Sequence, residues 1–292
     1  MESFLQLLVS GIAFGCIYTL VAIEYSVIYQ ASGLVNFSHG QWITLGGFVF
    51  GGTMIRQFNM HYIPAMLLSL VVMGIFGALV AKGIFNPLRH LPNNLFVVLG
   101  TVMLGKIIIE LCRIIWGASA FRIEGFLSDT VKIGGIVFPE VYIWIVIISV
   151  IFLVVQAILF QKTKLGKAMR CVASDQKAAA LMGINVNRNI IITVAYSAII
   201  CAIIGILVAP IFNVDINMAN SISLKGFAAG VVGGFGTIGG SIVGGLVIGI
   251  IENMYLMIGP AIYKDVVAFV ALIIFLLMKP TGLLGKNQQK RS

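Results

Sequence analysis

The chain has 292 residues, of which 60% are hydrophobic and 10% carry a formal charge. A soluble domain of this length usually has about 25% charged residues, and the mean hydropathy here is +1.07. These values exclude a soluble enzyme, a disordered chain and a nucleic-acid-binding module, and they leave a membrane-embedded protein. The net charge of +9 is compatible with this class, because the Lys and Arg residues gather in short segments between apolar runs.

The apolar segments predict the membrane spans. A spanning helix needs roughly 20 apolar residues, because the hydrocarbon layer is about 30 Å thick. Two glycine-rich stretches, 41–54 and 224–258, are also apolar, and the second is long enough for two passes if it breaks near Gly239 and Gly240. We therefore predict a single all-α integral membrane domain over residues 1–292, with eight or nine transmembrane helices. The clear candidates are residues 4–29, 63–85, 95–116, 141–160, 190–212 and 266–278, the last being short unless it begins near Ala261.

The distribution of positive charge predicts the orientation, since short cytoplasmic loops are enriched in Lys and Arg. Segment 161–189 and the tail after residue 278 are basic, whereas segment 117–140 is balanced. We expect the first two in the cytoplasm and the third outside. This arrangement requires an even number of crossings after residue 189, which makes 224–239 a real crossing. Whether 41–54 crosses or re-enters, and hence the side of the N-terminus, stays open.

A polar break precedes the first glycine-rich stretch. Asn36 or Ser38 can cap the short helix that follows, and the exposed N–H groups of a broken helix can meet a carboxylate in a transporter. An ordinary capped turn is an equally good interpretation. The candidates for a substrate pathway here are Asn36, Ser38, His39, Gly40 and Gln41.

The second glycine-rich segment has ten glycines within residues 226–249. Glycines at four-residue spacing let helix backbones approach closely. The letters of 234–239 match a dinucleotide-binding fingerprint, but the strand before it and the acidic residue about 20 positions later are missing, so helix packing is the better interpretation. Because 33–52 is also glycine-rich, composition allows two repeats of inverted topology. The glycines expected at helix contacts are Gly226, Gly230, Gly234, Gly236, Gly240 and Gly244.

Charged residues inside apolar stretches usually face a bundle interior or water. Lys106, Glu110 and Arg113 are spaced for mutual pairing along one helix. Glu252 has no partner nearby in the sequence, so Glu252 and Asn253 are added to the candidates for the substrate pathway.

No pattern for catalysis or metal binding is apparent, and we expect a chain that is not an enzyme. Ser38 and His39 are adjacent, which prevents them from facing each other as nucleophile and base. The four cysteines lie far apart without a CxxC pair, so neither a zinc site nor a disulfide framework is expected. The sequence has no Walker motif, so any ATP must be hydrolysed by another chain.

Four ordered segments resemble permeases of branched-chain amino acid ABC importers, of the smaller-permease type. The resemblance covers essentially the whole chain, and the four ordered segments make it specific to this family. Relatives usually have Ala where this chain has Ser38. The segments are Gly33 to Gly40 (GLVNFSHG), the polar segment 163–185, the glycine-rich segment 224–234, and the C-terminal pair 263–267 and 279–285.

The resemblance implies a bacterial inner-membrane importer subunit that passes leucine, isoleucine or valine inward by alternating access. It implies a second homologous permease, two cytoplasmic ATPases and an extracytoplasmic binding protein as partners. ATP and Mg are then expected on the ATPases, with no cofactor on this chain. Urea, amides or other amino acids stay alternative substrates, and an ion-coupled secondary transporter stays the alternative class.

Segment 161–189 resembles the ATPase-coupling loop of that family. Its middle, 168–182, has strong helix formers and neither Pro nor Gly, and Gly183 suits a left-handed helix end. Arg170 and Asp175 are expected to supply polar contacts at the rim of the docked surface. A mostly small apolar stripe is expected to press against an ATPase, and it consists of Ala168, Val172, Ala179 and Met182.

Overall fold

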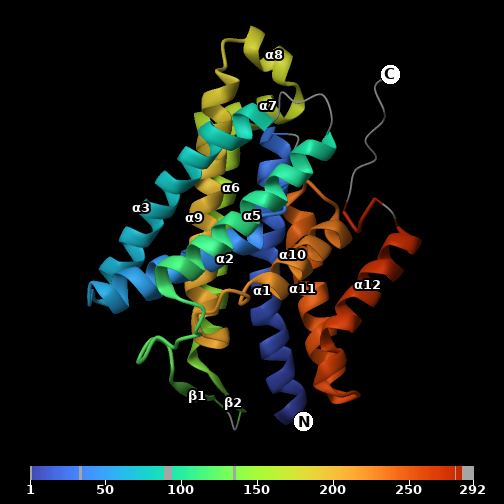
Figure 1. The fold of residues 1–292 in the computed structure, drawn as a ribbon. Helices are drawn as coiled ribbons and strands as arrows, with labels where there is room; N and C mark the ends of the chain where they lie inside the picture. Colours follow the sequence, from blue (N-terminus) through green and yellow to red (C-terminus); the bar gives the residue numbers. More distant parts are fainter. Residues whose placement is uncertain (1, 33–34, 89–93, 134–135, 280, 285–292) are drawn as a thin grey trace. The chain divides into compact units, whose positions relative to one another are not determined.

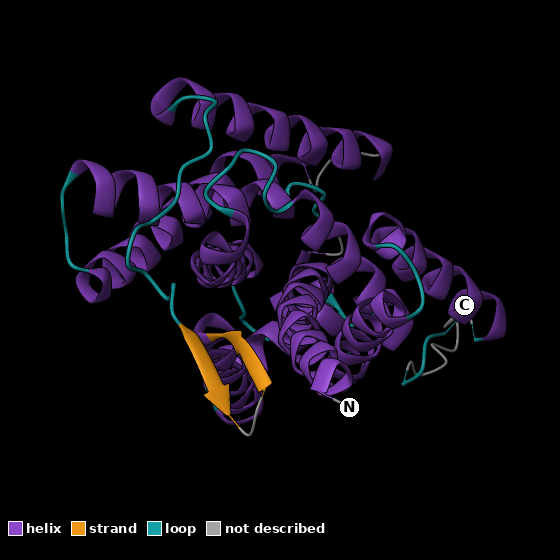
Figure 2. Cartoon of the chain, turned by 90° about the horizontal axis from the view of Figure 1, so that it is seen from below, coloured by secondary structure: helices purple, strands orange, loops and turns teal. Residues whose placement is uncertain are grey.

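The computed structural model describes residues 2–32, 35–88, 94–133, 136–279 and 281–284, most of which are helical (Figure 1). Gly33 and Leu34 of the polar break lie outside the described residues, as do Pro280 and the basic tail 285–292. Among the described residues, helices dominate and the only sheet is one two-stranded hairpin, as Figure 2 shows.

The chain forms two compact units that alternate along the sequence. Unit 1 consists of Met1–Ser26, Asp129–Ser149 and Ser221–Ser292, and unit 2 of Val27–Ser128 and Val150–Asn220. Two long helices, α1 (Glu2–Ser32) and α6 (Glu140–Lys162), are divided between the units, and the first residue of a third helix, Asn220, belongs to unit 2 while the rest of that helix belongs to unit 1. The single domain over residues 1–292 stays a prediction.

Seven helices in the described chain are long and apolar enough to cross a membrane. They include all six clear candidates. The last span begins at Ala261, which gives the candidate 266–278 the additional length that it needs to cross. The glycine-rich stretch 41–54 and the first part of 224–258 are helical as well, although neither is among these seven. The all-α integral membrane fold is therefore confirmed. The seven spans are Ser3–Gln30, Tyr62–Leu88, Leu95–Trp116, Glu140–Lys162, Val186–Phe212, Ile238–Met257 and Ala261–Met278.

Unit 2 is organised around the long helix α9 (Val186–Phe212), against which α2 (His39–Gly47) and α3 (Tyr62–Val80) pack most extensively. Helix α2 continues without a break into the π-helix η1 (Phe48–Gln57). The other elements of this unit are η2 (Ala81–Phe85), α4 (Asn86–Leu88), α5 (Asn94–Trp116), α7 (Lys164–Ser174) and α8 (Gln176–Leu181).

Glycines bring these backbones into direct contact. A Cβ on Gly205 of α9 would overlap the backbone of α2, and a Cβ on Gly77 of α3 would overlap Ala198 of α9. Such close approach is the usual way helices associate in lipid, where burying apolar surface drives little association.

Unit 1 contains α10 (Asn220–Gly233), α11 (Ile238–Met254), η3 (Tyr255–Met257), η4 (Ala261–Tyr263) and α12 (Lys264–Met278), together with the N-terminal part of α1. Three of the glycines predicted for helix packing occupy such contacts. A Cβ on Gly226 would overlap Val21 of α1, and one on Gly240 or Gly244 would overlap the backbone of α10. The sequence interpretation missed Gly245 and Gly249, which face α1 in the same way.

The break between α10 and α11 differs from the prediction. It lies at residues 234–237 rather than near Gly239 and Gly240, so Gly234 and Gly236 form a turn instead of a helix contact. Gly234 has φ +107°, which an L side chain rarely adopts, and Thr237 starts α11 because its Oγ1 accepts the N–H of Gly240 at 3.2 Å. Gly230 has ordinary spacing, since its Cβ would lie 3.6 Å from Ala22.

The hairpin is an element that the sequence interpretation missed. Strand β1 (Thr130–Ile133) pairs antiparallel with β2 (Ile136–Pro139) inside the segment interpreted as a balanced loop. Apolar and polar residues alternate before the dipeptide 134–135, which is Gly-Gly, and an apolar run follows it; Gly-Gly between two such runs is a recognised hairpin signal. The two glycine-rich segments fall in different units, so the inverted repeat stays a prediction.

A matched pair of substitutions on α11 tests the glycine contacts. We expect Gly244→Ala to destabilise the protein by about 1–3 kcal/mol, because its methyl group would meet the Ala229 carbonyl oxygen. Gly239→Ala lies on the same helix with its nearest neighbour 3.9 Å away, and we expect no loss there, because alanine favours helix. Thermal midpoints of the detergent-solubilised variants measure the difference. Equal midpoints would contradict the packing role.

Candidate functional site

The polar break before α2 is folded by its own side chains. Asn36 and Ser38 are both buried, and the Ser38 N–H and hydroxyl donate to Asn36 Oδ1 at 3.0 and 2.6 Å. The Phe37 N–H donates to Thr101 Oγ1 of α5 at 3.3 Å. Ser38 is the N-cap residue of α2, as predicted, but its side chain makes no capping hydrogen bond. Asn36 instead holds the turn that leads into the helix.

Several polar atoms near the start of α2 are buried without a hydrogen-bond partner among the described residues. They are Asn36 Nδ2, Gln41 Oε1, Trp42 Nε1 and Thr44 Oγ1. Gln41 lies against Gly105 of α5, whose missing side chain leaves room for the carboxamide. Unsatisfied buried polar groups are costly, so a stretch that carries several of them is suited to meet a polar ligand or water. The five predicted pathway residues of unit 2 lie together, in this turn and in the first turn of α2. They are Asn36, Ser38, His39, Gly40 and Gln41.

A buried ionic cluster occupies unit 1. Lys225 Nζ of α10 lies 2.7 Å from Glu252 Oε1 of α11 and 2.5 Å from Asp265 Oδ1 of α12. Lys264 Nζ lies 3.3 Å from the same Glu252 oxygen, and the Tyr18 hydroxyl donates to Glu252 Oε2 at 2.7 Å. Glu252 is fully buried and the Lys225 side chain is 5% exposed. Two lysines and two carboxylates thus neutralise one another where α1, α10, α11 and α12 meet.

This geometry bears on the second group of pathway candidates. Glu252 has its charge balanced by two lysines that are distant in sequence, and Asn253 Nδ2 donates to the Gly249 carbonyl at 2.9 Å in its own helix. Both side chains are therefore engaged in holding helices, and their place in the pathway stays a prediction.

Two ion pairs were possible on α5, between Lys106 and Glu110 or between Glu110 and Arg113, and the second is present. Arg113 Nη1 lies 3.0 Å from Glu110 Oε2, and both side chains are about half exposed. Within the described chain Lys106 takes no part in that ion pair and is exposed.

The segment interpreted as a coupling loop consists of two helices rather than one. Asp175 separates α7 from α8 and caps the second, because its Oδ1 accepts the N–H groups of Lys177 and Ala178 at 2.8 and 3.0 Å. Asp175 was predicted to make a polar contact with an ATPase, and the structure shows in addition that it caps α8. Gly183 has φ +81°, which confirms the predicted left-handed helix end.

The predicted docking stripe is wrong in its orientation. Val172 and Ala179 are 1% and 3% exposed, because the apolar sides of α7 and α8 face the permease itself, and Ala168 is half-buried. Gly166 packs directly on the backbone of α6 at Leu159 and Phe160. Met182 is exposed as predicted, and Leu181, which the stripe did not include, is 89% exposed.

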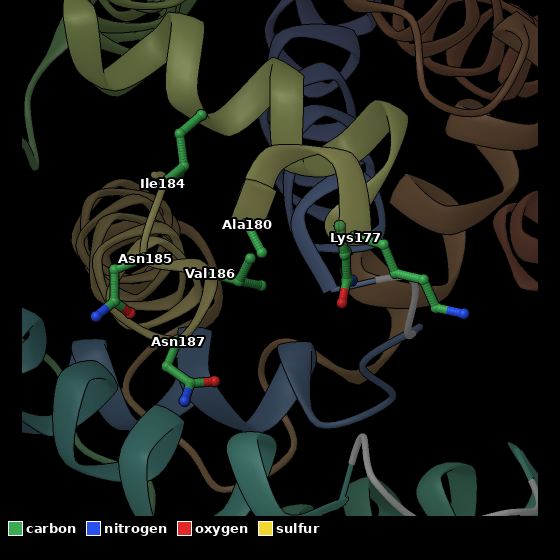
Figure 3. A pocket seen from close by; sticks show the side chains of 7 residues that line it. Lys177, Ala180, Ile184, Asn185, Val186 and Asn187 are labelled. Atoms are coloured by element: carbon green, nitrogen blue, oxygen red, sulfur yellow. The ribbon is translucent and has the colours of Figure 1, made fainter. Parts of the chain in front are cut away.

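A cavity of about 380 Å³ lies where α8 leads into α9. Figure 3 shows Ala180 of α8 and Val186 of α9 close together in it, with the ammonium group of Lys177 directed away from them. Asn185 is the N-cap residue of α9, and its Oδ1 accepts the Arg188 N–H at 3.0 Å. The cavity is thus lined by aliphatic and amide side chains together with Lys177.

The ionic cluster predicts an asymmetric mutational response. We expect Lys225→Met to destabilise the protein by about 3–5 kcal/mol, because it leaves buried carboxylate charge without its nearest cation. The double variant Lys225→Met/Glu252→Gln should recover most of that loss, because both partners become neutral. Thermal midpoints in detergent measure both. A double variant no more stable than Lys225→Met would contradict mutual neutralisation.

The chain is similar to known transport permeases along nearly its whole length. A family described as the permease component of branched-chain amino acid transport systems matches residues 7–276. The permease protein BraD of a high-affinity branched-chain amino acid transport system, from Pseudomonas aeruginosa, is 29% identical over 301 residues, covering 99% of this chain and 98% of that protein. The corresponding protein LivH of Escherichia coli is 28% identical over 304 residues, covering 99% and 97%.

A more distant relative, the ribose import permease protein RbsC of Haemophilus influenzae, is 25% identical over 281 residues, covering 92% of this chain and 83% of that protein. No solved structure matches the chain. The family match covers nearly all the described helices. The chain belongs to the family of permease components of branched-chain amino acid transport systems.

Proposed function

We propose that this chain is a permease subunit of an ABC importer that moves branched-chain amino acids across the bacterial inner membrane by alternating access. The proposal rests on the family match over residues 7–276 and on two relatives of nearly equal length that bear this name. The chain acts as a transport subunit rather than an enzyme. Because it has no Walker motif, ATP and Mg²⁺ are assigned to two partner ATPases. A second permease and an extracytoplasmic binding protein complete the complex.

The end of α8 supplies the proposed contact with an ATPase, on the cytoplasmic side together with the C-terminus. Leu181 and Met182 are 89% and 83% exposed, although both are large and apolar. Adjacent exposed apolar side chains, rimmed by polar residues, are typical of protein contact sites. Arg170 and Lys177 are exposed nearby on α7 and α8 and supply the polar rim. This apolar pair is the observation that carries the coupling role.

Helix α9 connects this surface with the proposed pathway. It begins directly after α8, and Gly205 near its other end contacts the backbone of α2 at Ile43 and Gly47. A displacement of α8 that moved α9 would therefore reach the start of α2, where Asn36 to Gln41 lie. The unpaired polar atoms there are the groups proposed to meet the zwitterionic substrate.

The coupling surface is tested by a matched pair of charge insertions. We expect Leu181→Asp to weaken ATPase association about tenfold or more, because a buried apolar contact becomes a buried charge. Ile258→Asp is the control, since Ile258 is equally exposed at 89% but lies in the turn before α12. Co-purification of ATPase with each variant gives the result. Normal association of Leu181→Asp would place the dock elsewhere.

Uptake of labelled leucine by the reconstituted complex tests the transport function. We expect uptake that needs ATP, the ATPases and the binding protein together. Binding of urea, an amide or ribose by the partner binding protein, with no binding of leucine, would refute the substrate and leave the importer class standing. Uptake by this chain alone, driven by an ion gradient without nucleotide, would refute the importer class in favour of a secondary transporter.

A further inference from the structure

An apolar groove runs between α3 and α5 in unit 2. It has a volume of about 230 Å³, and no polar side chain except the indole of Trp116 lines it. Its walls are partly exposed on the outside of the helices, as Val72, Leu111 and Ile115 are. Its floor comes from α2 and η1. The residues that define it are Leu45 and Val49 below, Val72 and Phe76 on one side, and Leu111 and Ile115 on the other.

The groove continues into a polar cavity at one end. A second cavity, of about 360 Å³, shares Ile115 and Trp116 with the groove and adds Arg56, Gln57 and Phe121. The lining thus changes from apolar side chains in the groove to a set that includes the cationic Arg56 and the amide Gln57 in the cavity, with Ile115 and Trp116 shared between them. That combination fits a molecule with an apolar chain and an anionic head.

Arg56 packs on an aromatic ring, and it forms no ion pair within the described part of the chain, although Glu124 lines a neighbouring cavity with it. Its guanidinium lies over the ring of Phe121, 5.3 Å from the centroid. Phe121 is fixed by a two-way backbone pairing with Val214, at 3.1 and 2.8 Å, and by edge contact with Phe48. Among the described residues no carboxylate forms an ion pair with Arg56, whereas Arg113 on α5 is already paired with Glu110.

One membrane span ends at the cavity and another begins five residues after it in the sequence, so we expect the cavity at a membrane interface. Trp116 ends the span Leu95–Trp116, and Tyr62 begins the span that follows η1. Tryptophan and tyrosine gather at this level, where lipid phosphates also lie. The Trp116 indole is fixed by its hydrogen bond to Thr53 Oγ1 at 3.1 Å. From Trp116 to Ile108 the groove descends eight residues of α5, or roughly 12 Å, which is within one lipid leaflet.

We propose that this groove and cavity bind one anionic phospholipid, with an acyl chain along Val49, Val72 and Leu111 and the phosphate on Arg56 and Gln57. The site lies at the end of α9 opposite α8, so the lipid belongs to the outer leaflet in the orientation given above. Short outer loops are normally poor in arginine, and a lipid phosphate gives the Arg56 charge its partner there.

Native mass spectrometry of the full-length permease in detergent, titrated with dioleoylphosphatidylglycerol, tests the head-group contact. We expect Arg56→Gln to raise the concentration for half occupancy about tenfold, as loss of a charge-assisted hydrogen bond does. Arg122→Gln is the matched control. Arg122 lines a neighbouring cavity that includes Arg56 but does not line the one that contains Trp116. We expect it to leave occupancy unchanged.

A second pair of variants tests the acyl-chain groove. Val72→Phe fills the groove from its wall, and we expect it to weaken lipid retention several-fold, while Val71→Phe should not. Val71 is the neighbouring residue, is 56% exposed and does not line the groove. Both positions face outward, so neither substitution has to enter the packed core.

Four outcomes decide the proposal. Selective loss in Arg56→Gln and Val72→Phe supports it. Equal loss in Arg56→Gln and Arg122→Gln would show general attraction to positive charge and overturn it. Displacement of the lipid by glycerol 3-phosphate at equal concentration would show an anion cavity without a chain site. Unchanged lipid retention with loss of permease dimers in Val72→Phe would assign the groove to a second copy of the chain.

Discussion

Helices in lipid gain little from burying apolar surface, so their association depends on how closely their backbones approach. Both units of this permease meet that constraint with glycine. In unit 1 the α11 glycines Gly244 and Gly249 face α10 and α1, and in unit 2 Gly77 and Gly205 bring α3 and α2 onto α9. At each of these positions a single methyl group would overlap backbone atoms or, for Gly77, the Cβ of Ala198, none of which can rotate away as a longer side chain can. The packed helices of a unit are therefore expected to move together, as rigid groups.

The same environment makes buried polar groups costly, and the two units handle them differently. In unit 1 Lys225, Lys264, Glu252 and Asp265 form a neutral cluster whose members come from three helices. Such a cluster fixes the helices that carry it, because removing Lys225 or Glu252 takes the nearest opposite charge away from a buried partner. At the start of α2 in unit 2, by contrast, Gln41 Oε1 and Thr44 Oγ1 have no partner among the described residues. The first arrangement is suited to holding structure, and the second is the better place for a ligand.

The sequence predicted the spans well because a spanning helix needs an uninterrupted apolar run, and that property is local. Positions where helices break were predicted less well. The turn at Gly234 depends on a backbone conformation that any of several neighbouring glycines can adopt, and the break at Asp175 depends on one carboxylate capping α8. The contacts of Glu252 were not predictable, because Lys225 and Lys264 meet it only after α10, α11 and α12 have packed. The hairpin had a signal in its Gly-Gly dipeptide, but the balanced charge of the segment concealed it.

The predicted docking stripe on α7 and α8 was correctly identified as the apolar side of these helices, but it is not the surface left free for a partner. Small apolar residues at helical spacing indicate that one side of a helix is covered, but not what covers it. In α7 and α8 that cover is the permease itself, because Gly166 lets α7 lie directly on α6, and Val172 and Ala179 then point inward. What remains for a partner is the opposite end of α8, where Leu181 and Met182 are exposed because no residue of this chain covers them among those described.

The groove between α3 and α5 follows from the same glycine packing. Gly46 and Gly205 place α2 against α9, and Gly77 places α3 against α9 as well. Helix α5 packs mainly on α2, so a gap remains between α3 and α5, with Leu45 and Val49 as its floor. Filling that gap from within the chain would need larger side chains on α2. The glycines of α2, however, hold this helix close against α9. The unit therefore leaves an apolar surface that lipid must cover, and it ends at Trp116 and Arg56, where a lipid also presents its phosphate.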